Sequence, residues 1–370
     1  MKNVVFVFGT RPEAIKLAPV IMRMWSLQEE FRPLVIVTGQ HREMLDHTLE
    51  VFGISPHIDL NVMSPGQDLF GVTNKALGGL GAALGEHRPD WVVVQGDTTT
   101  AFTGALAAFY LRIPVAHVEA GLRTRNIYNP FPEEVNRQLI GRIASLHFAP
   151  TEGARENLRK EGVDGGLIRV TGNTSIDALH WVLRTSENRL DGILPAVLHR
   201  DPSRRMILVT THRRESFGPP MAGIMEGLRR VARTYPDVSL FFPVHRNPNV
   251  RRHAMGRLAG LENVILHDPI RYVPFVQAMK RSYLILTDSG GVQEEAPSLG
   301  KPVLVLRETT ERPEGIAAGT ASLIGTDPER IFETVSELLC DERKYDAMSR
   351  AVNPYGDGRA AERITAALSE

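Results

Sequence analysis

Short apolar runs alternate along this chain with longer amphipathic stretches, a pattern typical of parallel β-sheets covered by helices on both faces. The runs fall into two series. The first comprises residues 4–8, 34–37, 91–94 and 115–118, and the second comprises residues 206–209, 240–242, 264–266, 284–286 and 303–306. Polar residues and a turn at Asp201-Pro202-Ser203 interrupt the pattern between them, so residues 183 to about 203 are predicted to be a linker.

The two series predict an α/β protein with two Rossmann-like, doubly wound parallel-sheet domains facing a central cleft. A chain of 370 residues is long enough for two hydrophobic cores. We expect an N-terminal domain over 1–182 and a C-terminal domain over 200–357, with a C-terminal helix at about 358–370 able to pack back on the first domain. Open parallel sheets bind ligands beyond the carboxyl ends of their strands, so functional residues should follow strands.

Composition narrows the range of partners. Lys plus Arg and Asp plus Glu both number 43, which argues against nucleic acid or a membrane surface as a partner. The apolar stretch after Met1 is too short for a signal peptide, and a cytoplasmic enzyme is expected. The single cysteine, Cys340, offers no thiolate metal cluster and is expected to pack inside a helix. We predict neither a metal site nor a bound cofactor.

The loop after the first strand, residues 9–16, is a glycine turn that leads into a helix. Free N–H groups at a helix start attract anions, and Arg11 and Lys16 add positive charge there. A capped helix with solvated basic residues explains the loop equally simply. It matches neither a P-loop nor a dinucleotide-binding fingerprint.

Three carboxylates follow buried strands or begin a helix in the same half: Asp97, Glu119 and Glu133. Any one of them could merely cap a helix. Three that converge on one crevice repel each other and hold a proton more readily, which suits a proton donor or acceptor near neutral pH.

The second half contains the densest motif, residues 286–296, where a strand meets Ser289, Gly290 and Gly291 at a helix start. Backbone N–H groups can approach phosphate oxygens there because glycine has no Cβ. Glu295, about one turn later, suits a ribose hydroxyl pair. Three further side chains could complete a nucleotide site: His212 for phosphate or a proton, Arg312 for phosphate, and Phe275 for a flat base, although Phe275 alone is more simply a core residue.

Taken together, these segments resemble the non-hydrolysing UDP-N-acetylglucosamine 2-epimerases over essentially the whole chain. The matching phrases are GTRPEAIK, TGQHREML, GDTTT, HVEAGLR, FPEEVNRQ, THRRESFG, LTDSGGVQEEAPSLGKPVL and TTERPE. The resemblance implies a glycosyltransferase-B-like fold, interconversion of UDP-N-acetylglucosamine and UDP-N-acetylmannosamine, usually a homodimer, and a place in bacterial surface polysaccharide precursor synthesis.

The resemblance also implies roles for individual residues. Asp97, Glu119 and Glu133 match the catalytic carboxylates, with Arg137 beside them, and His212 matches a residue at the diphosphate. Contacts to the ligand are implied for Arg11, Lys16, Ser289, Gly290, Gly291, Glu295 and Arg312. It does not assign the acid and the base.

Three positions depart from the family pattern. Glu43 and Gly66 stand where relatives regulated by a second UDP-N-acetylglucosamine carry Gln and Arg, so that regulation is not expected in the same form. Ile270 stands where the family has a glutamine, which shifts uracil contacts toward the backbone and Phe275.

Inverting C2 without a nicotinamide points to elimination of UDP, giving a 2-acetamidoglucal, followed by re-addition. Three alternatives stay open at this point. They are a 2-epimerase of a related UDP-2-acetamido sugar such as a diacetamido uronic acid, a glycosyltransferase of the same fold, and an inactive nucleotide-sugar sensor.

Overall fold

The computed structural model describes the chain except residues 40–41, 65 and 187–203, and the side chains of residues 42, 43 and 214. Within that part, the chain divides into two compact units. The first comprises Met1–Ala178 and Tyr355–Glu370, and the second comprises Leu179–Pro354. Most of the predicted linker, 187–203, lies outside the described residues, and the predicted boundaries at 182 and 200 stay a prediction.

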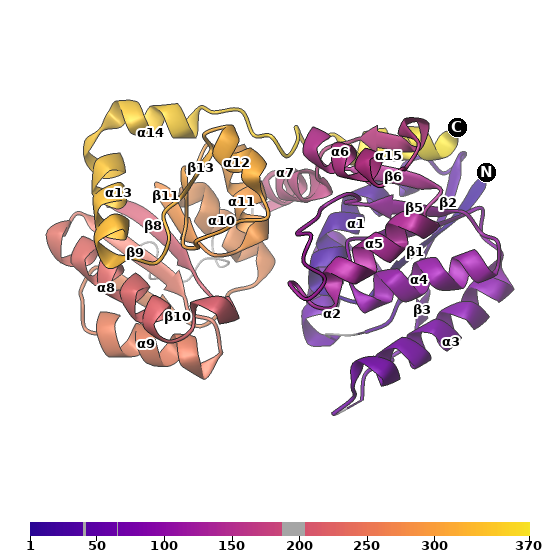
Figure 1. Ribbon diagram of the computed structural model, residues 1–370, viewed down its shortest axis with the longest axis horizontal. Coiled ribbons are helices and arrows are strands. Elements are labelled where there is room, and N and C mark those ends of the chain that lie inside the picture. The colour runs from indigo at the N-terminus through magenta and orange to yellow at the C-terminus, as the bar shows by residue number, and fades with distance from the viewer. Residues whose placement is uncertain (40–41, 65, 187–203) are drawn as a thin grey trace. The chain divides into compact units, whose positions relative to one another are not determined.

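The first unit contains a seven-stranded parallel sheet in the order β3-β2-β1-β4-β5-β6-β7 (Figure 1). Its strands are β1 Lys2–Phe8, β2 Phe31–Val37, β3 Ile58–Asp59, β4 Trp91–Gln95, β5 Val115–Val118, β6 Leu146–Ala149 and β7 Ile168–Val170. Its helices are α1 Arg11–Trp25, α2 Arg42–Phe52, α3 Leu69–His87, α4 Thr99–Tyr110, α5 Glu133–Ile143, α6 Glu152–Lys160, the 3₁₀ turn η1 Gly165–Leu167, and α15 Ala360–Ser369. Helix α7, Thr174–Ser186, runs from the first unit into the second.

Apolar side chains on both faces of the central strands form the core of this unit. Val4, Val5, Phe6, Val7 and Phe8 of β1 are all fully buried, as a strand covered by helices on both sides requires. Side chains of Thr98 and Thr151 cap the starts of α4 and α6 by accepting backbone N–H hydrogen bonds. These helices therefore begin shortly after the strands before them, and the short loops in between lie at the carboxyl ends of the strands.

The last helix completes the first unit, although the whole second unit precedes it in the chain. The carboxylate of Asp177 accepts hydrogen bonds from the backbone N–H groups of Ala360 and Ala361 at 3.2 and 2.9 Å, which satisfies the start of α15. Lys2 Nζ donates to the carbonyls of Leu368 and Ser369 at the other end, where the negative end of the helix dipole favours a cation.

The second unit contains a six-stranded parallel sheet in the order β10-β9-β8-β11-β12-β13 (Figure 1). Its strands are β8 Arg205–Thr210, β9 Val238–Pro243, β10 Val264–His267, β11 Leu284–Thr287, β12 Val303–Val305 and β13 Ala321–Leu323. Its helices are η4 Arg214–Ser216, α8 Pro219–Thr234, α9 Pro248–Leu258, α10 Tyr272–Arg281, α11 Gly290–Glu295, η5 Ala296–Leu299, α12 Pro313–Ala317, α13 Pro328–Cys340 and α14 Glu342–Ser349.

All nine predicted strands are present, and four more complete the sheets. Strands β3, β7 and β13 are only two or three residues long and lie at sheet edges, so they carry no clear apolar run. The prediction for Cys340 was wrong, because this residue is exposed at the end of α13. No helix in the described part of the chain is long and apolar enough to cross a membrane.

Candidate active site

In the first unit, Asp97 and Glu119 follow the neighbouring strands β4 and β5. The backbone of Glu119 has φ of 65°, a left-handed conformation that is costly for a residue with a Cβ. Gly96, just before Asp97, has φ of 68°, which glycine adopts freely. The two loops therefore turn sharply at the sheet edge, and the strain at Glu119 is held by the contacts of its side chain.

The Glu119 carboxylate is almost completely enclosed, with its side chain 8% exposed. One oxygen pairs with the ammonium group of Lys16, and the other accepts a hydrogen bond from the Gln95 amide. Asn173 Nδ2 lies 3.5 Å from the oxygen that Lys16 contacts. A Cβ at Gly96 would stand 3.5 Å from the other oxygen, so the carboxylate packs directly against the turn that carries Asp97.

Arg137 on α5 joins the second carboxylate to the same cluster. Its guanidinium pairs with Asp97 and donates to Glu134 Oε2 at 3.1 Å. Asn136 Nδ2 donates to the backbone carbonyl of Asp97 at 2.9 Å. The first turns of α5 thus hold both the backbone and the side chain of Asp97.

Consecutive glutamates at the start of α5 have opposite environments, because neighbouring helical residues point about 100° apart. Glu134 is fully buried and accepts hydrogen bonds from the backbone N–H groups of Thr124 and Arg125. Burial alone would raise its pKa, but these hydrogen bonds and others lower it overall. Glu133 instead has a buried oxygen, Oε2, with no hydrogen-bond partner among the described residues. An unpaired buried acceptor is costly, and a hydroxyl group of a substrate would satisfy it.

Glu13 is a further buried carboxylate, and it was not predicted as a site residue. Its Oε2 accepts hydrogen bonds from the backbone N–H groups of Gly9 and Thr10, and its Oε1 accepts one from the Thr98 hydroxyl at 2.6 Å. Burial raises the pKa of Glu13. The hydrogen bonds of Glu13 therefore connect the turn before α1 with the loop between β4 and α4, which carries Asp97.

Two histidines face each other across β5 and β6, where His117 and His147 are register partners. Nε2 of His117 lies 2.7 Å from the carbonyl of Gly96 and supports the Asp97 turn. Burial lowers the pKa of His117 to about 3 and that of His147 to about 4. Both rings are therefore neutral in the folded protein.

These histidines should make the protein sensitive to acid. An unfolded chain protonates histidine near pH 6.5, whereas the folded chain does so only near pH 3 to 4. The stability they provide is present above pH 6.5 and is lost as the pH falls below it. In His147→Gln, the loss of unfolding free energy between pH 7 and pH 5 is expected to shrink by about 2 kcal/mol. Urea unfolding of both proteins at the two pH values tests this, and equal losses would contradict it.

In the second unit, the glycine turn at the end of β11 is shaped around Arg312. A Cβ at Gly290 would lie 2.6 Å from Cζ of Arg312, so the guanidinium rests directly on this glycine. A Cβ at Gly291 would meet nothing within 4 Å. Ser289 donates its backbone N–H to the Thr287 hydroxyl at 2.9 Å. The turn therefore presents one glycine to a cation and the next to open space.

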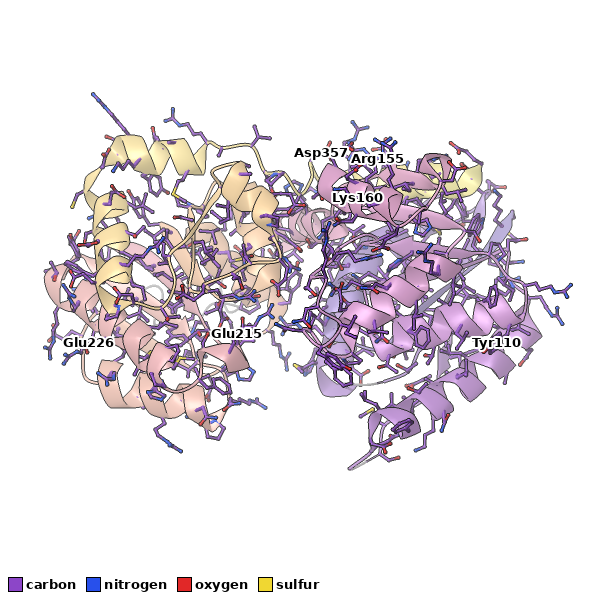
Figure 2. The ribbon with its side chains drawn as sticks, in the orientation of Figure 1. Tyr110, Arg155, Lys160, Glu215, Glu226 and Asp357 are labelled. Carbon is purple, nitrogen blue, oxygen red and sulfur yellow. The ribbon has the colours of Figure 1, made fainter. Side chains whose placement is uncertain are left out.

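Acidic side chains balance the cations around this turn. Arg312 Nε donates to Glu294 at 2.9 Å, and Glu311 lies 3.5 Å from Arg312 and 3.7 Å from Arg213. Burial acts to raise the pKa of Glu311, but Arg307 and Arg312 lower it to about 2. Arg307 also pairs at 2.8 Å with Glu215, which is labelled in Figure 2.

The remaining predicted nucleotide residues lie in the same unit. The His212 side chain is 41% exposed at the end of β8, beside β11 in the sheet. Glu295 is buried on α11, and Phe275 is half-buried on α10 rather than inside the core. The TGQHR loop falls partly on residues 40–41, and neither these nor the Glu43 side chain belong to the described part of the chain. In that part, no group of three His, Cys, Asp or Glu residues is arranged to hold a metal ion.

The structure thus groups the predicted residues into two sets. The first set lies around the carboxyl ends of β4 and β5 in the first unit. It comprises Asp97, Glu119, Glu133, Arg137 and Lys16, with Arg11 at the start of α1. Ser289, Gly290, Gly291 and Arg312 form the turn of the second unit, with His212 on the neighbouring strand. Sequence reasoning missed Glu13, Gln95, Glu134 and Asp288. All four lie inside or beside the quoted motifs, which is the signal that could have found them.

Two doubly wound parallel sheets, one with a glycine turn and cations at its strand ends and the other with paired carboxylates, place the chain in the glycosyltransferase-B-like fold class. The comparisons with known proteins narrow this class. The model of the family described as UDP-N-acetylglucosamine 2-epimerase matches residues 25–369, and the chain belongs to that family.

Relatives match over nearly the whole chain. A UDP-N-acetylglucosamine 2-epimerase of Escherichia coli (strain K12) is 54% identical over 369 residues, covering 99% of this chain and 98% of the relative. The crystal structure of the Neisseria meningitidis enzyme bound to UDP-GlcNAc is 46% identical, with a TM-score of 0.93 and 99% of each chain covered. The Methanocaldococcus jannaschii structure with UDP-GlcNAc and UDP is 35% identical, with a TM-score of 0.82, covering 100% of this chain and 99% of that one. The predicted family, fold class and enzyme class, an isomerase, are confirmed.

Proposed function

We propose that the chain interconverts UDP-N-acetylglucosamine and UDP-N-acetylmannosamine at C2, by anti elimination of UDP to a 2-acetamidoglucal and re-addition of UDP. Membership of the family and the UDP-GlcNAc bound to the Neisseria meningitidis relative support the substrate. The observation that carries the mechanism is the cluster at the carboxyl ends of β4 and β5, where Lys16 pairs with Glu119 and Arg137 pairs with Asp97. Such a cluster can move a proton, and a hydride carrier is not required.

The second unit would hold the leaving group. Gly290 and Gly291 offer backbone N–H groups to the diphosphate and Ser289 offers its hydroxyl, while Arg312 and His212 offer positive charge or a hydrogen-bond donor. Glu295 suits the ribose hydroxyls, and Phe275 suits one face of the uracil ring. Donors arranged before the reaction stabilise the charge that develops as the C1–O bond breaks, typically by several kcal/mol.

The first unit would handle the proton at C2. Removal of this proton from one face and its return on the other require two groups, and Asp97, Glu119 and Glu133 supply the candidates. Lys16 and Arg137 pair with Glu119 and Asp97, whereas the unpartnered Oε2 of Glu133 fits a group that exchanges hydrogen bonds with substrate. Arg11 begins α1, two residues before Glu13, whose carboxylate holds the loop that carries Asp97.

Incubation with UDP-N-acetylglucosamine alone in D₂O tests the reaction. NMR should detect UDP-N-acetylmannosamine with deuterium at C2, together with small amounts of UDP and the glycal. A glycosyltransferase would need an acceptor and would give no epimer. If the epimer forms without deuterium at C2, the elimination mechanism is wrong.

Two alternatives concern the substrate and the activity itself. A 2-epimerase of a related UDP-2-acetamido sugar, such as a diacetamido uronic acid, would turn over that sugar faster in the same NMR assay. An inactive sensor would bind UDP-N-acetylglucosamine and leave it unchanged. The carboxylate cluster favours an enzyme. The strained backbone of Glu119 costs stability, and a protein that only binds its ligand would gain nothing from that strain.

We further infer a homodimer that serves surface polysaccharide precursor synthesis in the cytoplasm. Phe109 and Tyr110, at the C-terminal end of α4, are 57% and 67% exposed and supply an apolar surface for a second copy. Tyr110 is labelled in Figure 2. Sedimentation of the assayed protein would give its mass against the 41.0 kDa of one chain.

A further inference from the structure

Asp288 is a fully buried carboxylate to which the proposed mechanism gives no role. It follows β11, whose Thr287 is the register partner of Thr210 on β8, so it lies beside the start of the His212 loop. Its Oδ2 accepts hydrogen bonds from the Thr211 hydroxyl at 2.8 Å and from the backbone N–H groups of His212 and Arg213 at 2.7 and 2.8 Å. One oxygen therefore anchors the loop.

The other oxygen, Oδ1, is directed at a side chain. It is buried, lies 3.0 Å from Nδ1 of His212 and has no completed hydrogen bond within the described part of the chain. Burial acts to raise the pKa of Asp288, but His212 and the two backbone N–H groups lower it overall, so a carboxylate faces Nδ1. A carboxylate can only accept, which requires the proton on Nδ1.

A second histidine limits the movement of the ring. The His245 ring, at the end of β9, stacks on that of His212 with centroids 5.8 Å apart and planes 30° apart. The backbone N–H of Asn247 donates to Nδ1 of His245, so Nδ1 of that ring carries no proton. Burial and the neighbouring His212 lower the pKa of His245. A neutral ring thus stacks on His212, while a carboxylate lies at its Nδ1 edge.

We propose that Asp288 is a positioning residue that holds the His212 imidazole with a proton on Nδ1, so that Nε2 can take up a second proton from solvent and the imidazolium then faces the diphosphate. This inference rests on the proposed function for the role of Nε2, but the tautomer itself does not. The same strand end then sets both halves of the leaving-group site: Asp288 orients the imidazole, and the next residues, Ser289 to Gly291, form the glycine turn. A carboxylate that fixes the tautomer of a working histidine is a recurrent arrangement in enzymes.

The first experiment needs no variant at Asp288. ¹⁵N NMR of histidine-labelled protein, with His212 assigned from the signal lost in His212→Gln, should show the neutral ring protonated at Nδ1. Free imidazole in water favours the other tautomer. A His212 ring protonated only at Nε2 would overturn the proposal.

The second experiment exchanges the carboxylate for an amide. In Asp288→Asn, the amide oxygen can still accept from Thr211 and the two backbone groups, while its NH₂ faces Nδ1 and forces the proton to Nε2. We expect kcat to fall about 100-fold, with UDP affinity by calorimetry within about 3-fold of wild type. Asp288→Glu, which restores a carboxylate, should recover the Nδ1 tautomer and part of kcat.

Thr211→Val is the matched control. It removes a hydrogen bond to Oδ2 but leaves Oδ1 and His212 in place, so a loss of stability without a change of tautomer is expected. If Asp288→Asn leaves the His212 tautomer unchanged, the proposal is wrong whatever the activity. If the tautomer changes and kcat does not, Asp288 positions the ring as proposed and the role assigned to His212 in the reaction is the part that fails.

Discussion

Glu119→Gln is expected to lower kcat by about 1000-fold while UDP affinity stays within about 3-fold of wild type. Glutamine preserves the size of the side chain but cannot take up a proton. It also leaves Lys16 without its charged partner and places two amides, its own and that of Gln95, against each other. Stopped assays for UDP-N-acetylmannosamine and calorimetry with UDP measure the two quantities separately.

Glu161→Gln is the control for this variant, because it also removes a paired carboxylate from the first unit. Glu161 accepts hydrogen bonds at 2.7 Å from Nε and Nη2 of Arg123 and lies outside the carboxylate cluster. Its replacement should change kcat by no more than about 2-fold. Equal losses of turnover and UDP affinity in Glu119→Gln would contradict the separation of roles between the two units.

Gly290→Ala is expected to weaken UDP binding by about 100-fold. The new methyl group would lie 2.6 to 2.9 Å from three atoms of the Arg312 guanidinium, so Arg312 must leave its position and its hydrogen bond to Glu294. Because the clash involves the end of a flexible side chain, the fold should survive. Calorimetry with UDP and thermal unfolding of the same samples test both statements.

Two further variants test whether the displacement of Arg312 is what weakens UDP binding in Gly290→Ala. Gly256→Ala, in the interior of α9 with nothing within 4 Å of the new Cβ, should bind UDP as wild type and be slightly more stable. Adding Gly290→Ala to Arg312→Ala should cost little more than Arg312→Ala alone, since both changes remove the same contact. Additive losses would mean that the new methyl group also obstructs the ligand directly, apart from its effect on Arg312.

The fold could be predicted from the sequence wherever strands are fully apolar. Residues 4–8 and 92–94 are buried on both faces, so their composition marks them as strands without any partner being known. Edge strands such as β3, with only Ile58 and Asp59, owe their conformation to the neighbouring strand. Local sequence carries little information about such pairing.

The sequence predicts which loops carry the candidate site residues but says much less about their roles. Asp97 and Glu119 follow strands, and the sheet brings them together. Glu133 and Glu134 are adjacent in sequence, and only the phase of α5 separates a buried loop anchor from a carboxylate whose Oε2 has no partner among the described residues. Glu13 and Asp288 are similar cases, because the contacts that give them meaning come from Thr98 and Thr211 on other loops.

The acidic partners of Arg312 and Arg213 have a consequence for how tightly the product is held. Since Glu294 and Glu311 already compensate these cations, a diphosphate bound there as we propose would displace internal counter-ions and gain only the difference between two anionic environments. Such an exchange lowers the affinity for the diphosphate but keeps the selectivity for a doubly charged group. It suits a leaving group that must be released from carbon, retained for the return step, and finally allowed to diffuse away.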